Sequence, residues 1–480
     1  MTKKFNIKAL CSAYILLPLI VGSVLGFLQL QAPRADESSV HFNRMMYNIE
    51  RMAIERVVGT ENLEYVRDLL IQEIYDMGLT PTIQTVAVTQ AEAIDARVRL
   101  GLVGSVPPRF FNLPEEFLLH NIFVRLENPN AERTIMFVTH YDSFPGSPGA
   151  GDAMAPVTAI LEAMRSQADN QYLENNIYFL LTDGEEFGAI GALAFIHEYP
   201  ELRDSIDMII NVEAQGNRGG LIVFETSPQA HSLLSLYQRA VPRPIGFSIG
   251  LAVYDTLNTY TDFSFFREYG WSGINMAIIE GAQHYHMPTD TFENLDRNTA
   301  YHYLTVTLGL ANYVANNTLS SMDVAENAVF FPFFPNNMIV LTYTWAYILC
   351  IFSIVLAIAF LFIEYKNNRL SIYFASYVSM LIAFSTASAI FFHAGSYLFW
   401  IPLLTTVIVR FFQKWLIIYY IAKIISRIST LILWIPLVYV SLLFTPVRTT
   451  PYILGIFLFI YFASCGIEIY EFRYKKSSMS

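Results

Sequence analysis

Four apolar runs in this chain each lead directly into side chains that commonly bind metal ions. The runs are TIMFVTHYD, NIYFLLTDGEE, DMIINVEAQG and INMAIIEGAQHYH, and the side chains at their ends are His140, Asp142, Glu185, Glu186, Glu213 and His286. Uninterrupted runs rich in Ile, Val and Phe are typical of strands buried on both faces, and hence of a parallel sheet. Because such sheets carry their sites at the carboxyl ends of the strands, we expect these side chains at one edge. A cluster of this kind repels itself unless cations hold it, and its ligand types suit zinc.

The hydrophobic residues, 54% of the 480, are concentrated at the two ends of the chain. Stretches of about 20 apolar residues can cross a bilayer as helices. The sequence predicts such spans near 9–30, 338–363, 370–393, 395–411, 428–446 and 452–471. We therefore expect an N-terminal tail and anchor (1–31), a polar domain (32–337) and a C-terminal bundle of about five helices (338–480), with the lipid bilayer as a partner.

Basic residues indicate the orientation of these spans. Those beside the spans fall on one side of a six-span arrangement, and only Arg448 lies in a short loop opposite. The positive-inside rule then places both termini in the cytoplasm and residues 32–337 outside it. Two alternatives stay open: residues 1–30 could be a cleaved signal peptide, and 411–427 could be a seventh span instead of an interfacial helix.

Charge and cysteine content exclude other classes of function for the polar domain. Residues 32–337 hold 17 Arg, no Lys and 38 acidic residues, a net charge of −21. So acidic a domain argues against a nucleic-acid partner. Cys11, Cys350 and Cys465 all lie in apolar stretches, so the domain has neither a disulfide framework nor a thiolate zinc site.

The polar domain alternates strand-like and helical segments. Residues 40–80 have helical spacing and end near Gly78, IQTVAV and NIFVRLEN are strand-like, and 88–116 read as an irregular loop or insertion. From 134 to 315 strands alternate with helical stretches such as VTAILEAMRSQ. This pattern predicts an α/β sandwich with a mixed sheet.

Several candidate residues have ordinary explanations when they are taken singly. Asp152 follows the turn GSPGAG and could be a helix N-cap. The doublet Glu185-Glu186 could begin a solvated helix, and either His284 or His286 could be a loop histidine. Five such residues in order, each at or just after a strand end, are unlikely to arise by chance, so the set favours a metal site.

The motifs that carry these residues resemble those of the co-catalytic-zinc aminopeptidases. The matching pieces are THYDS, PGAGD, TDGEEFGAIGA, NVEAQG, TDFSFFREYG and YHMPTDTFENLD, within about residues 45–310. The chain is most similar to the membrane-anchored branch, the endoplasmic-reticulum metallopeptidases and vacuolar membrane proteases. That resemblance implies a three-layer α/β sandwich with a mostly parallel sheet, beside an α-helical transmembrane bundle.

The resemblance also implies two zinc ions bridged by Asp152 and a solvent molecule. One ion would bind Glu186 and His286, and the other His140 and Glu213. Glu185 would be the general base of peptide hydrolysis. The resemblance also implies that Asp142 orients His140 and that Asp262 has a supporting role. Tyr254 and Tyr260 are alternative oxyanion donors, and nothing in the spacing selects between them.

Two positions depart from the family pattern, and two other functions remain open. Ala153 stands where the family often has a second acid or amide, and Glu213 where many soluble aminopeptidases have aspartate. A glutaminyl-cyclase-like acyltransferase would use the same scaffold with one zinc ion. A chaperone or receptor on an inactive scaffold would have lost ligands, whereas this chain keeps all five and Glu185.

Overall fold

The computed structural model describes residues 31–348 except 100–105, most of 249–258, 320–325, 335 and 347. Within these residues seven strands form one sheet in the order β1-β2-β4-β3-β5-β7-β6. The strands are β1 (Thr82–Thr89), β2 (Glu116–Leu126), β3 (Thr134–His140), β4 (Asn176–Thr182), β5 (Met208–Ala214), β6 (Ile222–Thr226) and β7 (Gly273–Ile278). A separate antiparallel hairpin joins β8 (Ala328–Phe334) to β9 (Asn337–Thr342).

The four central strands, β4, β3, β5 and β7, are parallel. β2 and β6 pair antiparallel with their neighbours at the two sides. β3, β4, β5 and β7 are the four apolar runs, and every residue of β3, β5 and β7 is buried. The predicted mixed, mostly parallel sheet is therefore confirmed, and its continuous apolar runs follow from burial on both faces.

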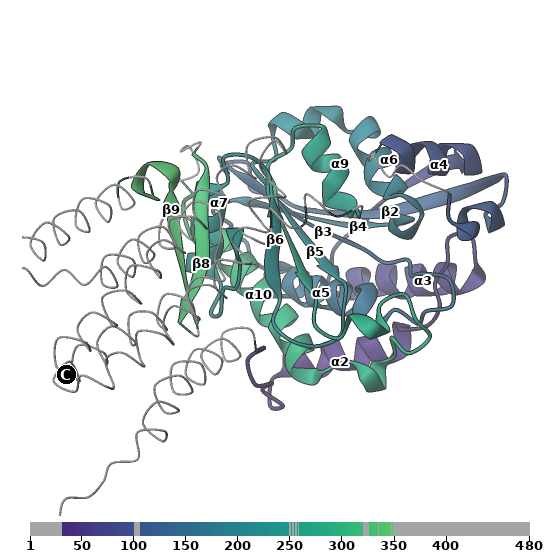
Figure 1. Cartoon of the computed structure of the whole chain (residues 1–480), viewed down its shortest axis with the longest axis horizontal. Helices are drawn as coiled ribbons and strands as arrows, with labels where there is room; N and C mark the ends of the chain where they lie inside the picture. The colour runs from purple at the N-terminus through teal and green to yellow at the C-terminus, as the bar shows by residue number, and fades with distance from the viewer. Residues whose placement is uncertain are drawn as a thin grey trace, which may run out of the picture. The chain divides into compact units, whose positions relative to one another are not determined.

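Helices cover both faces of the sheet (Figure 1). They are α2 (Val40–Met52), α3 (Glu61–Asp76), α4 (Gln90–Arg99), α5 (Ala155–Gln167), α6 (Ile190–Glu198), α7 (His231–Ala240), α9 (Asp262–Glu268) and α10 (Arg297–Asn316). One core contains α2, α3, α5 and α10 with alternate strand residues such as Phe137 and Ile210. The other contains α6 and α9 with the intervening residues, such as Val138 and Ile209. This alternation gives the three layers of the sandwich.

The prediction of an irregular segment at 88–116 was wrong for most of its described part. The structure places α4 at Gln90–Arg99 and the short helix η1 at Pro108–Asn112. The helical signal of α4 is weak because the residues that it buries, Ala93 and Ala96, are small.

No helix in the described part of the chain is both long enough and apolar enough to cross a bilayer. The predicted spans lie outside the described residues, apart from the beginning of 338–363. Residues 338–342, assigned to the start of that span, belong to β9.

Candidate metal centre

The sheet order explains why residues far apart in sequence meet. The chain passes from β3 to β4 on one side of β3 and then crosses to β5 on the other side. Such a reversal opens a crevice at the carboxyl ends of the strands. His140 is the last residue of β3, and Glu213 is the penultimate residue of β5. Both side chains therefore reach the crevice.

Turns after the strands supply the other members. Asp152 lies in the short helical turn η2 (Ala150–Met154) before α5, and Glu186 in the turn η3 (Glu185–Phe187) after β4. His286 lies in the loop after β7 with a left-handed backbone, φ 58°. Gly184 directly precedes η3 and has a left-handed backbone, φ 76°, which glycine adopts without a steric penalty.

The structure brings the five predicted ligands together in two groups that share one residue. The ligand atoms of His140, Asp152 and Glu213 all lie within 4.8 Å of one another, and so do those of Asp152, Glu186 and His286. His284, the alternative to His286, belongs to neither group; its Nδ1 lies 3.0 Å from Thr289 Oγ1.

The two carboxylate oxygens of Asp152 face different groups. Asp152 Oδ1 lies 3.2 Å from His140 Nε2, while Oδ2 lies 3.4 Å from His286 Nε2. Glu213 Oε2 is 3.4 Å from the same His140 nitrogen, and Glu186 Oε2 is 3.1 Å from that of His286. Each oxygen of Asp152 thus lies in a different one of the two groups, and each group could hold a metal ion.

Asp142 connects a ligand with the turn that carries the glutamate doublet. Its Oδ1 lies 3.3 Å from His140 Nδ1 and accepts a hydrogen bond from the backbone N–H of Glu185 at 3.1 Å. Its Oδ2 accepts from the N–H of Glu186 at 3.2 Å. A carboxylate on the far nitrogen fixes the tautomer of a metal-binding histidine. Asp142 therefore contacts both His140 and η3, and its role in orienting His140 stays a prediction.

Glu185 is buried beside the cluster but belongs to neither group. No described residue forms a hydrogen bond with its carboxylate, and burial, together with Glu213 and Glu186, raises its pKa well above the usual value. Such a carboxylate is available to a water molecule.

The cluster carries more negative charge than its histidines balance. Burial raises the pKa of Glu186, and Glu186 Oε1 is buried with no hydrogen-bond partner among the described residues. Burial alone would lower the pKa of His286, but Glu186 and Asp152 raise it to about 9. Carboxylates likewise raise the pKa of the buried His140. Oxygen and imidazole ligands with an unpaired buried carboxylate oxygen fit zinc, three protein ligands per ion.

Asp262 and the two predicted oxyanion donors, Tyr254 and Tyr260, differ in their hydrogen bonds. Asp262, the first residue of α9, is fully buried and accepts a hydrogen bond from Thr182 Oγ1; burial and Glu213 raise its pKa to about 7. The Tyr260 hydroxyl accepts from Gly188 N–H at 3.1 Å and donates to the Glu186 carbonyl at 3.3 Å. The buried Tyr254 hydroxyl has no hydrogen-bond acceptor or donor within normal distance in the described region.

Sequence reasoning missed three residues of this region. Asp290 accepts hydrogen bonds from the N–H groups of Gly151 (2.9 Å) and Asp152 (3.0 Å), and so fixes the backbone of the shared ligand. The ring of Tyr285 stacks on His286, with centroids 3.7 Å apart. The spacing HYHMPTD offered a weak signal for Asp290 and Tyr285, since both flank His286.

The third missed residue is Arg56, which is completely buried. Its guanidinium binds the carbonyls of Tyr141 (2.9 Å) and Gly149 (3.1 Å), on the segment that leads from β3 to Asp152. Burial lowers its pKa to about 10, while Asp142, Asp290 and Asp152 oppose that shift. No local pattern distinguishes Arg56 from the other arginines.

Comparison with known proteins is consistent with this geometry. Residues 121–311 match the family model described as peptidase family M28. A vacuolar membrane protease of Candida glabrata is 29% identical over 215 residues, which cover 44% of this chain and 22% of that protein. A putative endoplasmic reticulum metallopeptidase 1 of Schizosaccharomyces pombe is 31% identical over 229 residues, 44% of this chain and 27% of that protein. The matches thus span about a quarter of these relatives.

Solved structures that are similar to this chain include an aminopeptidase and a glutaminyl cyclase. BSAP, a zinc aminopeptidase from Bacillus subtilis, is 13% identical with a TM-score of 0.46, covering 61% of this chain and 100% of that one. The glutaminyl cyclase of Fimbriiglobus ruber is 13% identical with a TM-score of 0.44, covering 58% and 98%.

Proposed function

We propose that this chain, which carries a peptidase family M28 domain at residues 121–311, is a zinc metallopeptidase that holds two zinc ions and acts as an aminopeptidase. The observation that carries the proposal is the position of Asp152, whose two oxygens face two separate histidines. His140 and Glu213 would complete one zinc site, and Glu186 and His286 the other. Three protein ligands at each position leave room for solvent or substrate, as in catalytic sites.

Glu185 is the general base in this proposal. Bound zinc ions would lower the pKa of a water molecule and polarise the scissile carbonyl. Glu185 accepts one proton from the attacking water while the oxygen of that water bonds to the carbonyl carbon. It then delivers the proton to the amide nitrogen as the carbon–nitrogen bond breaks, so the products are a carboxylic acid and a free amine. Burial raises the pKa of Glu185, and a carboxylate with a raised pKa is a stronger proton acceptor.

Tyr285 is the best-placed donor for the oxyanion. Its ring stacks on His286, and the carboxylates of Asp152, Glu186, Glu185 and Glu213 all raise its pKa further after burial. No described residue forms a hydrogen bond with the Tyr285 hydroxyl. Tyr254 is the second choice, because its unpartnered hydroxyl lies in the field of Glu213 and Glu185. Tyr260 is engaged with the backbone of Glu186 and Gly188, so its role is to position η3.

We also propose that the protein is anchored in a membrane. The relatives are named as vacuolar membrane and endoplasmic reticulum proteins. Together with the predicted spans and basic residues, this supports anchoring in a bilayer with residues 32–337 on the extracytoplasmic side. A cysteine introduced at the exposed Tyr172 of the full chain would react with an impermeant thiol reagent from that side only.

The test of the chemistry compares the two neighbouring glutamates. We expect Glu185→Gln to lower kcat for peptide hydrolysis by roughly 100- to 10,000-fold while zinc content stays at the wild-type level. Glu186→Gln is the matched control, since it changes the same group one residue away but removes a ligand, and should lower zinc content. Full activity in Glu185→Gln would remove Glu185 from the base role.

A further inference from the structure

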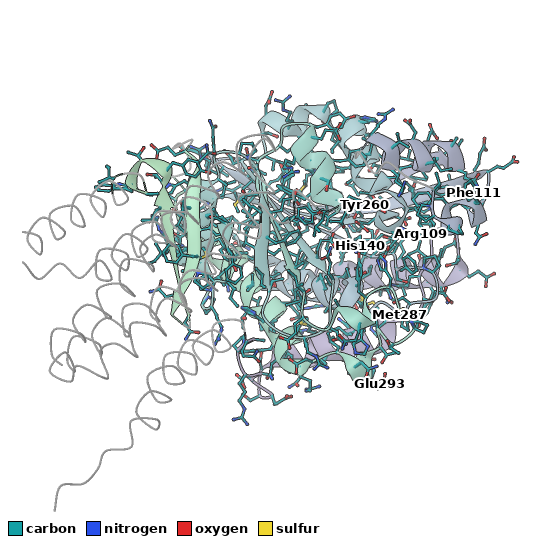
Figure 2. All side chains as sticks on the ribbon, viewed as in Figure 1. Arg109, Phe111, His140, Tyr260, Met287 and Glu293 are labelled. Carbon is teal, nitrogen blue, oxygen red and sulfur yellow. The ribbon has the colours of Figure 1, made fainter. Side chains whose placement is uncertain are left out.

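Arg109 lies beside the metal centre and takes no part in the chemistry described above. It belongs to η1, and its Nε donates a hydrogen bond to the backbone carbonyl of Glu186 at 3.1 Å. Its guanidinium carbon lies 5.2 Å from the ring centre of Phe110 and 4.9 Å from that of Phe144. Figure 2 labels Arg109 in the same part of the domain as His140 and Tyr260. One hydrogen bond and two aromatic rings thus hold the guanidinium in position.

These contacts tie Arg109 to one of the two metal groups. The Phe144 ring stacks on His286, with centroids 4.1 Å apart and planes 13° apart. Glu186, whose carbonyl Arg109 binds, supplies its carboxylate to the same group. Arg109 therefore contacts the backbone of Glu186 directly and reaches His286 through Phe144, on the Glu186–His286 side of the centre.

No carboxylate among the described residues forms an ion pair with Arg109. Its side-chain hydrogen bond uses Nε, and its terminal nitrogens Nη1 and Nη2 form no hydrogen bond with a described residue. The residue is only half-buried, so these nitrogens can reach solvent. By contrast, Arg51, Arg165 and Arg297 each pair with a glutamate. The hydrogen bond to η3 uses Nε alone, so Nη1 and Nη2 of the guanidinium remain available for a ligand.

We propose that Arg109 binds a carboxylate of the peptide substrate through Nη1 and Nη2. The proposal rests on the peptidase function given above and adds a class of substrate to it. A planar, pre-oriented guanidinium matches a carboxylate with two parallel hydrogen bonds. The carboxylate has two sources: the free C-terminus of a short peptide, or an acidic side chain next to the scissile bond. Arg109 is a specificity residue in either case.

The experiment measures a ratio of kcat/KM values for the full-length, zinc-loaded protein. One arm compares a dipeptide bearing a free C-terminal carboxylate with its C-terminal amide. The other arm compares Glu with Gln beside the scissile bond in a peptide amide. We expect Arg109→Gln to lower the preference for the carboxylate in one arm by about tenfold or more, since the pairs that are lost are charge-assisted. Arg109→Lys should keep part of it, because lysine retains the charge without the fork.

Arg125→Gln is the matched control. Its guanidinium also lies over a phenylalanine, Phe123, at 5.6 Å, but on β2 and without a contact to a ligand. The control should leave both ratios unchanged. If wild type cleaves the peptides but Arg109→Gln changes neither ratio, the carboxylate site is refuted while the peptidase stands. If wild type cleaves none of the peptides, the proposed function itself fails.

Discussion

Replacing Arg56 by methionine removes a buried guanidinium that joins α2 to the segment before Asp152. The side chain is 0% exposed and donates to five backbone carbonyls through four N–H groups, because three of the carbonyls share the two hydrogens of Nη1. The acceptors are Met52, Ile54, Tyr141, Pro148 and Gly149. Methionine fills a similar length but donates nothing, so these buried carbonyls lose a donor.

The magnitude follows from the number of bonds and from the burial. At a net value of about 1 kcal/mol each, the hydrogen bonds from four N–H groups contribute about 4 kcal/mol. Burial of the charge costs part of this, as the lowering of the pKa of Arg56 to about 10 indicates. We therefore expect the free energy of unfolding to fall by about 2–4 kcal/mol. For a large domain this corresponds to a decrease in Tm of roughly 4 °C or more.

Thermal unfolding of the full-length protein with zinc chelated measures this effect apart from metal binding. Arg297→Met is the matched control, because Arg297 pairs with Glu37 at the surface, where the side chains are 47% and 58% exposed. Such a pair contributes less than about 1 kcal/mol. If Arg56→Met lowers Tm no more than Arg297→Met does, the hydrogen bonds of Arg56 do not stabilise the fold as reasoned here.

Three further predictions concern the metal centre and the core. Asp290→Asn should weaken zinc binding by about 10- to 100-fold in a chelator competition, because it perturbs the two hydrogen bonds that hold the Asp152 backbone; unchanged affinity would contradict this. Tyr285→Phe should lower kcat by at least about tenfold, whereas Tyr260→Phe should act mainly on stability; the reverse order would assign the oxyanion to Tyr260. Burial lowers the pKa of His302 to about 4, so the unfolded chain binds an extra proton between about pH 6.5 and 4. The free energy of unfolding should therefore decrease by about 3 kcal/mol as pH falls through that window, and His302→Gln should remove this part of the slope in pH-dependent denaturation.

The central strands, and the polar residues at their ends, stood out in the sequence for one physical reason, whereas Asp152 was assigned as a ligand through the family resemblance. A strand buried on both faces must be continuously apolar, so a polar residue at its end, such as His140 or Glu213, stands out. The same argument failed for α4, whose buried face consists of Ala93 and Ala96. It also gave no strand order, since pairing depends on contacts between distant segments.

The supporting residues could not be found from local patterns. Asp290 binds the backbone of Asp152 across 138 residues of sequence, and Arg56 binds the Gly149 carbonyl across 93. Arg109 lies in a segment whose spacing predicted no regular structure. In each case the side chain type is common, and only the folded neighbourhood gives it a role.

Zinc titration of the metal-free full-length protein tests the central claim most directly. We predict two zinc ions per chain, with His140→Ala and His286→Ala each losing a different one and Asp152→Asn weakening both. A single zinc ion per chain in the wild type, lost equally in both histidine variants, would contradict the two-zinc centre and favour the cyclase-like alternative.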